Sequence, residues 1–324
     1  MRAAVIHRPG GPEVLELVDL PTPEARDGEV LIRVRAFGLN RAEIFTRQGD
    51  SGASVQWPRV IGIECVGEVV AAPGTDLQPG QKVAAMMGGM GRAYDGSYAE
   101  YTRVPRPSVF PVQTDLDWAT FGALPEMFQT SNGSLTTGLQ IKAGQTILIR
   151  GGTSSIGMTS AALAHQRGLT VLSTTRDPKK TGALRAIGVD HVLTDPGGSL
   201  VNLVNELVPG GVDRVLDLIG TSTLPDSLKC AAPGGLVCMT GMLGGEWVWE
   251  GFQPFLDLPN GVFLTSYSGG SEDISADQLQ TFVSAVEAGK APSNLDRTFP
   301  FEHIVAAHHF MEGNRAKGKL VVLL

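Results

Sequence analysis

The spacing of hydrophobic residues along the chain indicates two kinds of structure. Up to about residue 115, short runs rich in β-branched residues, such as 30–36 and 65–70, are separated by turns of Gly and Pro. This pattern predicts a β-rich segment. Residues 115–138 then have helical character, and Pro125 is placed to start or bend a helix.

From residue 146 on, strand-like and helix-like segments alternate, which predicts βαβ units and a parallel sheet. The predicted strands are 146–150, 170–173, 191–193, 214–218 and 236–240, with helices at 156–167 and 181–187. The tail is mixed again, with helices expected at 276–288 and 301–312 and a strand at 320–323. His308 and His309, in the second of these helices, are expected at the surface. We therefore expect an α/β chain in which residues 121–265 form a doubly wound domain inserted into a β-rich domain of residues 1–120 and 266–324.

Composition narrows the class of protein. With 324 residues, of which 42% are hydrophobic and 18% charged, the chain is long enough for two ordered domains with large cores. A net charge of −7 argues against a nucleic-acid partner. The three cysteines form no CxxC, so a disulfide scaffold is not expected. Since no signal peptide or membrane-spanning run is evident, we expect a soluble, cytoplasmic protein without membrane contact.

Residues 147–157 have the pattern of a phosphate-binding turn. An apolar strand runs into a Gly/Ser-rich turn, and an Ala-rich helix follows at once. The backbone N–H groups of such a turn and the positive end of the helix together bind a pyrophosphate. The alternative is a strand-turn-helix junction without a ligand. The candidate binding residues are Gly152, Thr153, Ser154, Ser155, Ile156 and Gly157.

The end of the next strand indicates which dinucleotide is bound. NAD enzymes usually place an acidic side chain there for the ribose 2′-hydroxyl. Here the strand end carries hydroxyls up to Thr175, followed by Arg176 and later Lys180. Arg176 can bind a 2′-phosphate through two nitrogens, and Lys180 adds a point charge. This pattern predicts NADPH, although Asp177 would reach a ribose if the loop folded differently.

Along essentially its whole length, the sequence resembles the medium-chain dehydrogenase/reductase superfamily, and within it the zinc-independent quinone oxidoreductases. The segments that carry the resemblance are 38–43, 58–64, 96–101, 139–144, the phosphate-binding turn, 211–217 and 316–322. The resemblance implies a GroES-like domain split around a Rossmann domain, an active site in the cleft between the domains, and a homodimer through the edge of the Rossmann sheet. Further cofactor contacts expected at strand ends, or implied by the family, are Ile219, Gly241, Met242 and Ser266.

The residues at the zinc positions differ from those of metal-dependent relatives. Matched motif to motif, these positions hold Asn40, Ile63 and Glu126. Ile63 cannot bind a metal, and Asn40 is a weak neutral ligand for zinc. We therefore expect no metal. Glu64 is expected to have a structural pairing role.

Without a Lewis acid nothing lowers the pKa of an alcohol hydroxyl, so substrates that already accept hydride are favoured. We therefore expect quinones and α,β-unsaturated carbonyls to be reduced by direct hydride transfer from NADPH. Two alternatives stay open, an enoyl-thioester reductase and a non-catalytic NADPH-binding sensor or structural protein.

Three residues are candidates for catalytic contacts. Asn40 is expected either to donate its amide N–H to the substrate carbonyl, to orient the nicotinamide, or only to cap its own turn. By the resemblance, Thr130 matches a position beside the nicotinamide. Phe45 stands where quinone reductases often have Tyr, and Glu43 where they often have Asp. The loss of a hydroxyl at Phe45 puts a direct transfer of substrate contacts in doubt.

Overall fold

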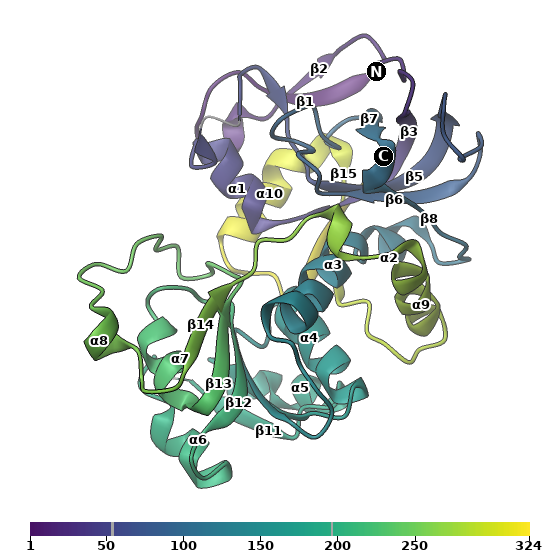
Figure 1. Cartoon of the computed structure of the whole chain (residues 1–324). Helices are drawn as coiled ribbons and strands as arrows, with labels where there is room; N and C mark the ends of the chain where they lie inside the picture. The colour runs from purple at the N-terminus through teal and green to yellow at the C-terminus, as the bar shows by residue number, and fades with distance from the viewer. Residues whose placement is uncertain (53–54, 196) are drawn as a thin grey trace. The chain divides into compact units, whose positions relative to one another are not determined.

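The computed structural model describes residues 1–52, 55–195 and 197–324, which form two compact units (Figure 1). The first, here called the split unit, consists of Met1–Gln129 and Gly270–Leu324, and the second, the inserted unit, is Thr130–Gly269. The units therefore divide at 129/130 and 269/270, where the sequence placed boundaries at 120/121 and 265/266. The functional assignment of the two units stays a prediction.

Antiparallel pairing dominates the split unit. Its larger sheet has the strand order β15-β16-β3-β5-β6-β8, with β7 also paired to β3, and a small sheet has the order β2-β1-β4. The strands are β1 (Arg2–Ile6), β2 (Glu16–Asp19), β3 (Glu29–Leu39), β4 (Arg59–Val60), β5 (Glu64–Ala71), β6 (Lys82–Met86), β7 (Tyr101–Pro105), β8 (Val109–Pro111), β15 (Leu295–Pro300) and β16 (Lys319–Leu323).

Strand β3 lies at the centre of this unit because it pairs with β16, β5 and β7. Most of its side chains are buried on both faces, which explains why the run of residues 30–36 is nearly continuous in apolar residues. Phe37 stacks on Tyr98 with ring centroids 4.6 Å apart. Met86 and Met90 are buried as well.

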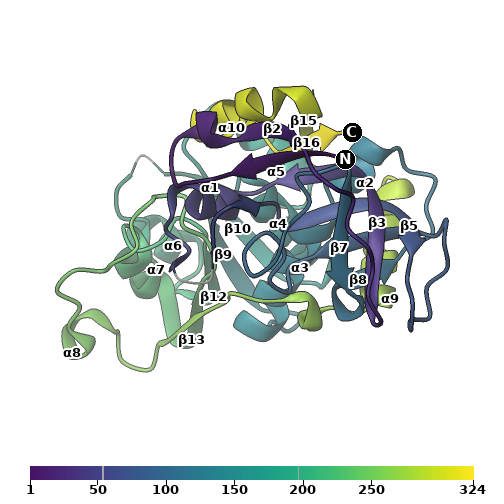
Figure 2. The same cartoon turned by 90° about the horizontal axis from the view of Figure 1, so that it is seen from above.

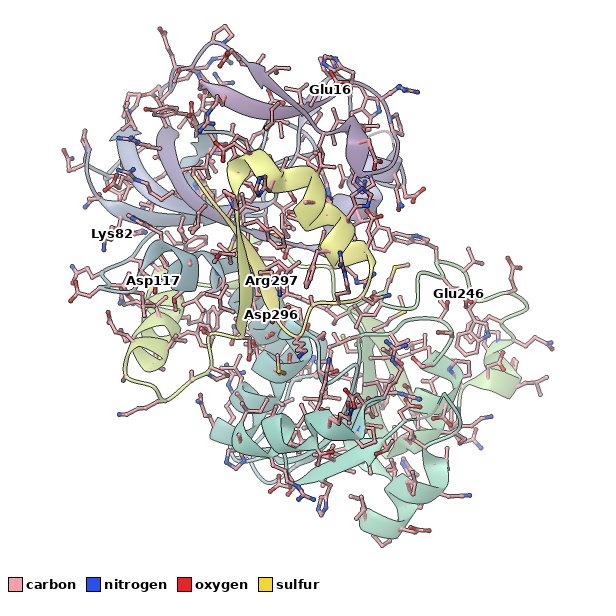
Figure 3. All side chains as sticks on the ribbon, turned by 180° about the vertical axis from the view of Figure 1, so that it is seen from behind. Glu16, Lys82, Asp117, Glu246, Asp296 and Arg297 are labelled. Carbon is pink, nitrogen blue, oxygen red and sulfur yellow. The ribbon has the colours of Figure 1, made fainter. Side chains whose placement is uncertain are left out.

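Helices pack on the sheet of the split unit. They are α1 (Arg41–Gln48), α2 (Trp118–Gly122), α9 (Ala276–Glu287), α10 (Ile304–Glu312) and the first part of α3 (Pro125–Gly133), whose residues from Thr130 on belong to the inserted unit. Asp117 begins α2 by accepting a hydrogen bond from the backbone N–H of Thr120. Lys82 of β6 lies near Asp117 at the start of this helix (Figure 3). Its Nζ is 5.3 Å from the centre of the Trp118 ring, which is a cation–π contact. Pro125 does start a helix, as predicted.

One prediction for α10 is wrong. Both His308 and His309 were expected at the surface, but His308 is fully buried, with Nε2 3.0 Å from the Tyr98 hydroxyl oxygen. Burial lowers the pKa of His308 to about 3, so its ring is neutral at physiological pH. His309, on the next face of the helix, is exposed beside Glu13.

The inserted unit is built on a parallel sheet with the strand order β11-β10-β9-β12-β13-β14. This order confirms the predicted Rossmann fold. From β9 the successive strands are added first on one side (β10, β11) and then, after β12, on the other (β13, β14), as in dinucleotide-binding sheets. The strands are β9 (Thr146–Arg150), β10 (Thr170–Thr175), β11 (His191–Thr194), β12 (Val212–Asp217), β13 (Ala231–Met239) and β14 (Phe263–Ser266). The helices are α4 (Ser155–Gln166), α5 (Thr181–Ala186), α6 (Val201–Leu207), α7 (Leu224–Cys230) and α8 (Pro254–Asp257).

Over the described ranges of both units, no helix has the length and apolar character needed to cross a membrane.

Candidate functional site

The structure brings the predicted cofactor residues to one edge of the parallel sheet. Because β9, β10, β12, β13 and β14 all run in the same direction, their carboxyl ends lie along this edge. Each predicted contact is at or just after one of these ends. They are Gly152, Thr153, Ser154, Ser155, Ile156 and Gly157 after β9, Thr175, Arg176 and Lys180 at β10, Ile219 after β12, Gly241 and Met242 after β13, and Ser266 at the end of β14.

The turn after β9 presents unpaired donors. Ser154 caps α4, since its Oγ accepts from the backbone N–H of Gly157 at 3.0 Å and donates to the carbonyl of Gly151 at 2.8 Å. The capping bonds of Ser154 leave the neighbouring backbone N–H groups of the turn without a partner in the described chain. Among the described residues, no protein acceptor meets the backbone N–H groups of Gly152, Thr153, Ser155 and Ile156. Such a set at a helix N-terminus fits a pyrophosphate.

Two glycines allow the turn to form. A Cβ atom on Gly157 would lie 2.4 Å from the carbonyl oxygen of Gly151, and one on Gly152 would lie 2.9 Å from the carbonyl oxygen of Thr174. Backbone atoms cannot move aside as a flexible side chain can. Both positions therefore require glycine to hold α4 close to the strands.

At the end of β10 the acidic side chain is already engaged. Asp177 accepts a hydrogen bond from the backbone N–H of Lys179 at 3.0 Å and begins a short 3-10 turn. Thr175 Oγ1 accepts from the backbone N–H of Asp177 at 3.1 Å. Arg176 and Asp177 are both exposed, and Lys180 is partly exposed. One carboxylate oxygen of Asp177 is thus used to begin the following turn, and the positive side chains lie exposed beside it.

One buried carboxylate fixes the turn after β12, and the turn after β13 packs against it. Asp217 Oδ1 accepts from the backbone N–H groups of Ile219 and Gly220, both at 2.9 Å. Gly241 lies against the first of these turns, where an added Cβ would be 2.5 Å from the carbonyl oxygen of Leu218. The carboxylate holds Ile219 in position and the glycine permits the close approach, so both turns keep a defined shape.

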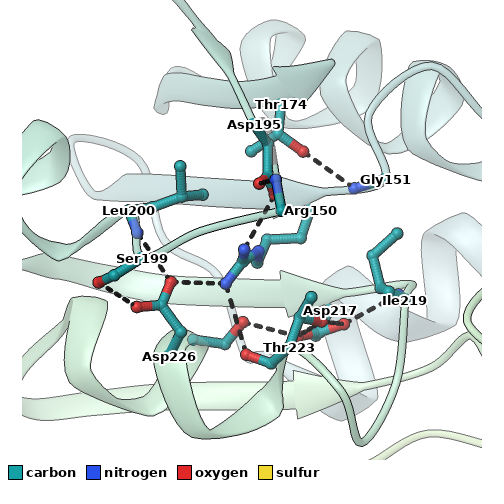
Figure 4. Close-up of polar contacts among 12 residues, drawn as sticks. Arg150, Gly151, Thr174, Asp195, Ser199, Leu200, Asp217, Ile219, Thr223 and Asp226 are labelled. Carbon is teal, nitrogen blue, oxygen red and sulfur yellow. Dashed lines mark hydrogen bonds and ion pairs between the residues drawn. The ribbon is translucent and has the colours of Figure 1, made fainter. Parts of the chain in front are cut away.

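Sequence reasoning missed a buried arginine beneath this edge. Arg150, the last residue of β9, is 1% exposed and lies between β11 and α7 (Figure 4). Its guanidinium nitrogens lie 2.9 Å from Asp195 Oδ2 and 2.7 Å from Asp226 Oδ2. Asp226 also accepts from the backbone N–H of Leu200 at 2.9 Å. The guanidinium thus connects three segments just before the phosphate-binding turn. The signal available in the sequence was a lone Arg at the end of an apolar strand.

The split unit contains a second buried ionic cluster, centred on Lys319. Its Nζ lies 2.7 Å from Glu64 Oε1 and 2.9 Å from Glu126 Oε2, and it donates to Asn40 Oδ1. Asn40 in turn donates through Nδ2 to Glu64 at 3.0 Å and to Glu43 at 3.2 Å. The expected pairing role of Glu64 is confirmed. The role of Lys319 was missed, although a Lys directly before the apolar run 320–324 was a visible signal.

The charges of this cluster follow from its surroundings. Burial raises the pKa of Glu43 to about 7, against hydrogen bonds from Ile63 and Asn40 that favour the ionised form. Burial alone would lower the pKa of Lys319, but the adjacent carboxylates of Glu126 and Glu64 raise it above the usual range of lysine. The ammonium is therefore charged at neutral pH, and Glu43 is a carboxyl that takes up a proton near neutrality.

Zinc does not fit the residues at the family's metal positions. Ile63 offers no ligand atom, and the side-chain oxygens of Asn40 and Glu126 already accept from the Lys319 ammonium. These are hard oxygen donors next to a cation, whereas zinc sites use Cys, His and acidic ligands around an open position. Across the part of the chain that the structure describes, no group of three or more His, Cys, Asp or Glu is arranged to hold a metal ion.

The three catalytic candidates do not form one constellation within either unit. Asn40 precedes α1 in the split unit, and its amide is engaged by Lys319, Glu64 and Glu43. Phe45 lies within α1 and is partly exposed. Thr130 is the first residue of the inserted unit, where its carbonyl accepts from Ser134 Oγ at 2.7 Å. Their catalytic roles stay predictions.

Comparison with known families agrees with this architecture. The model described as an alcohol dehydrogenase GroES-like domain matches residues 26–114, and the model described as a zinc-binding dehydrogenase matches residues 187–322. The chain belongs to the medium-chain dehydrogenase/reductase superfamily, which confirms the resemblance seen in the sequence. It is an oxidoreductase, and its fold is that of the pyridine-nucleotide-dependent enzymes of this superfamily.

Within this superfamily the chain is similar to reductases of activated alkenes and quinones. It is 28% identical to a 2-haloacrylate reductase of Burkholderia sp over 99% of the chain and 98% of that protein. It is 25% identical to the human quinone oxidoreductase, over 100% of the chain and 98% of that protein. It is 28% identical to the NADPH-dependent alkenal/one oxidoreductase of Arabidopsis thaliana chloroplasts, over 99% of the chain and 79% of that protein. Among solved structures, a mycobacterial protein in complex with NADPH matches all of both chains at 25% identity and a TM-score of 0.87.

Proposed function

We propose that this protein reduces quinones or α,β-unsaturated carbonyls by hydride transfer from NADPH, without a metal ion. The observation that carries the proposal is the Lys319 ammonium between Asn40 and Glu126, which takes the cation position of the zinc-dependent relatives. With these donors engaged, no Lewis acid can bind there to activate an alcohol. The chain's resemblance to quinone, haloacrylate and alkenal/one reductases supports substrates that already accept hydride.

The residues of the inserted unit hold the dinucleotide, which supplies the hydride when bound. The free N–H groups of Thr153 and Ile156 bind its pyrophosphate, and the fixed turn at Ile219 lines the nicotinamide half. The chain's contribution to the chemistry is orientation and exclusion of water, while solvent supplies the proton.

The proposal is tested by measuring NADPH consumption with a panel of quinones, enones and 2-enoyl thioesters, each with and without a chelator. We expect turnover with quinones or enones that the chelator does not change. Turnover of enoyl thioesters alone would identify an acyl-thioester reductase. Tight NADPH binding without turnover of any acceptor would identify a sensor or structural protein, and either result would contradict the proposal.

NADPH is the preferred coenzyme in this proposal. The exposed Arg176 and the nearby Lys180 offer positive charge for a 2′-phosphate. The carboxylate that competes for a ribose hydroxyl, Asp177, caps the following turn instead. An enzyme selective for NADH would need this carboxylate directed at the ribose.

We expect Arg176→Ala to raise the KM for NADPH about tenfold or more, because it removes a charge-assisted contact to phosphate, and to leave the KM for NADH nearly unchanged. Arg185→Ala is the matched control, since Arg185 is also exposed on the neighbouring helix α5. Steady-state kinetics with both coenzymes make the comparison. Equal use of NADPH and NADH by the unsubstituted protein would contradict the coenzyme assignment.

A second copy of the chain is the expected partner. Strand β14 lies at the edge of the parallel sheet, and its Phe263 is 60% exposed. Phe255 and Leu256 of α8 are also exposed, on a segment that extends away from the sheet (Figures 1 and 2). Pairing of two β14 strands would satisfy the free edge and cover this apolar surface. We expect sedimentation to show a dimer that Phe263→Glu dissociates, whereas a monomer before substitution would exclude it.

A further inference from the structure

Lys319 is a charged side chain held far from water. It is 2% exposed, at the first residue of β16, and it contacts side chains from three other elements of the split unit. These are Asn40 before α1, Glu64 at the start of β5, and Glu126 in the first turn of α3. A buried ammonium is costly unless every proton finds an acceptor, and here its three protons have three acceptors.

The ammonium decides how the Asn40 amide is oriented. Lysine can only donate, so the amide oxygen must face Lys319, and the NH2 group then faces Glu64 and Glu43. The opposite orientation would set the NH2 group against the ammonium. An amide whose oxygen accepts from a cation is also polarised, which strengthens its N–H groups as donors.

Glu64 extends this control to α3. Its Oε2 accepts from the backbone N–H of Glu126 at 2.8 Å, while Oε1 faces Lys319 and Asn40. Glu64 is fully buried, whereas Asn40 and Glu126 are 7% and 8% exposed. Of the three residues that contact the Lys319 ammonium, Asn40 and Glu126 are therefore the two that keep some exposure.

We propose that Lys319 is a positioning residue for the reduction: its ammonium replaces the metal cation of the zinc-dependent relatives and fixes the orientation of Asn40 and Glu126. This inference rests on the proposed function. Lys319 does not act as the acid, because its contacts with two carboxylates stabilise the charged form. Its effect on turnover passes through Asn40 and the charge state of the surrounding carboxylates.

Removal of the charge should leave a recognisable pH signature. Without the ammonium, the buried carboxylates would take up protons at higher pH, and a protonated Glu64 could no longer hold both Asn40 and Glu126. The titratable and charged groups that face Glu64 from the packed elements are Lys319, Glu126, Glu43, Tyr98 and the neighbouring Cys65. None of these except Lys319 brings a positive charge.

The test compares Lys319→Met, which keeps the aliphatic stem, with Lys319→Arg, which keeps the charge. For Lys319→Met we expect kcat to fall about tenfold or more and the KM for NADPH to stay within about twofold, because the dinucleotide contacts lie in the inserted unit. The acid limb of its kcat profile should move up by about one pH unit or more. Lys319→Arg should recover part of kcat and keep the original limb. Lys317→Met is the matched control, since Lys317 is exposed two residues away.

A double-mutant cycle tests whether Lys319 acts through Asn40. If it does, Asn40→Ala combined with Lys319→Met loses no more kcat than Asn40→Ala alone. Where Lys319→Met does not fold, Lys319→Gln, which keeps hydrogen-bond donors without the charge, takes its place. An unshifted pH profile in the neutral variant, or fully additive losses in the cycle, would overturn the inference. Absence of turnover in the unsubstituted protein would instead contradict the proposed function.

Discussion

Replacement of Gly157 by Ala is expected to weaken NADPH binding about 100-fold, as judged from the loss of the pyrophosphate contacts. The added Cβ would meet the carbonyl oxygen of Gly151 at 2.4 Å and the Cα of Gly152 at 2.8 Å. These atoms belong to the turn itself, so relief of the clash moves the backbone N–H groups that we propose bind phosphate. Fluorescence titration with NADPH measures the effect.

Gly182→Ala is the matched control for this substitution. Gly182 is also a helical glycine of the inserted unit, but nothing lies within 4 Å of the Cβ that alanine would add. We expect unchanged NADPH affinity and a stability gain of about 0.5–1 kcal/mol, because alanine restricts the unfolded chain. If Gly157→Ala bound NADPH as tightly as Gly182→Ala does, the turn would not be the phosphate site.

Replacement of Arg150 by Met is expected to lower the free energy of unfolding by about 3–5 kcal/mol. The side chain is 1% exposed, and its loss leaves the carboxylates of Asp195 and Asp226 without their buried cation (Figure 4). Breaking one side of a buried ion pair costs more than removing the whole pair, because a charge stays buried without compensation. Urea unfolding followed by circular dichroism measures the loss.

Two variants check the cause of this loss. Arg185→Met removes an exposed arginine from the same unit and should change stability by less than about 0.5 kcal/mol. Asp226→Asn in the Arg150→Met background should recover part of the loss, because it removes one of the unpaired charges. A loss below about 1 kcal/mol for Arg150→Met would show that the carboxylates find other partners.

The fold was largely predictable because its elements carry local signals. The alternation of apolar runs with helical segments after residue 146 matched the observed parallel sheet, and Pro125 begins α3 as expected. That the candidate dinucleotide residues lie at one edge of this sheet was also predictable, while their binding role stays a prediction. Parallel strands bring their carboxyl ends together, so contacts read from separate segments must meet at one edge.

The ionic clusters were not predictable in the same way. Lys319 lies 279 residues from Asn40 along the chain, and Arg150 lies 76 residues from Asp226. A short window shows only that each of these side chains lies beside an apolar run, and it does not identify the carboxylates that pair with it. His308 was mispredicted for the same reason, since its burial depends on Tyr98, which lies 210 residues away.

The sequence by itself determined the α/β class, the phosphate-binding turn and the loss of a zinc ligand at Ile63, because each depends on neighbouring residues or on a single side chain. Only the tertiary structure brought the Lys319 ammonium to Asn40, Glu64 and Glu126. A buried charge is stable there only because the fold places the carboxylates of Glu64 and Glu126 within 3 Å of it.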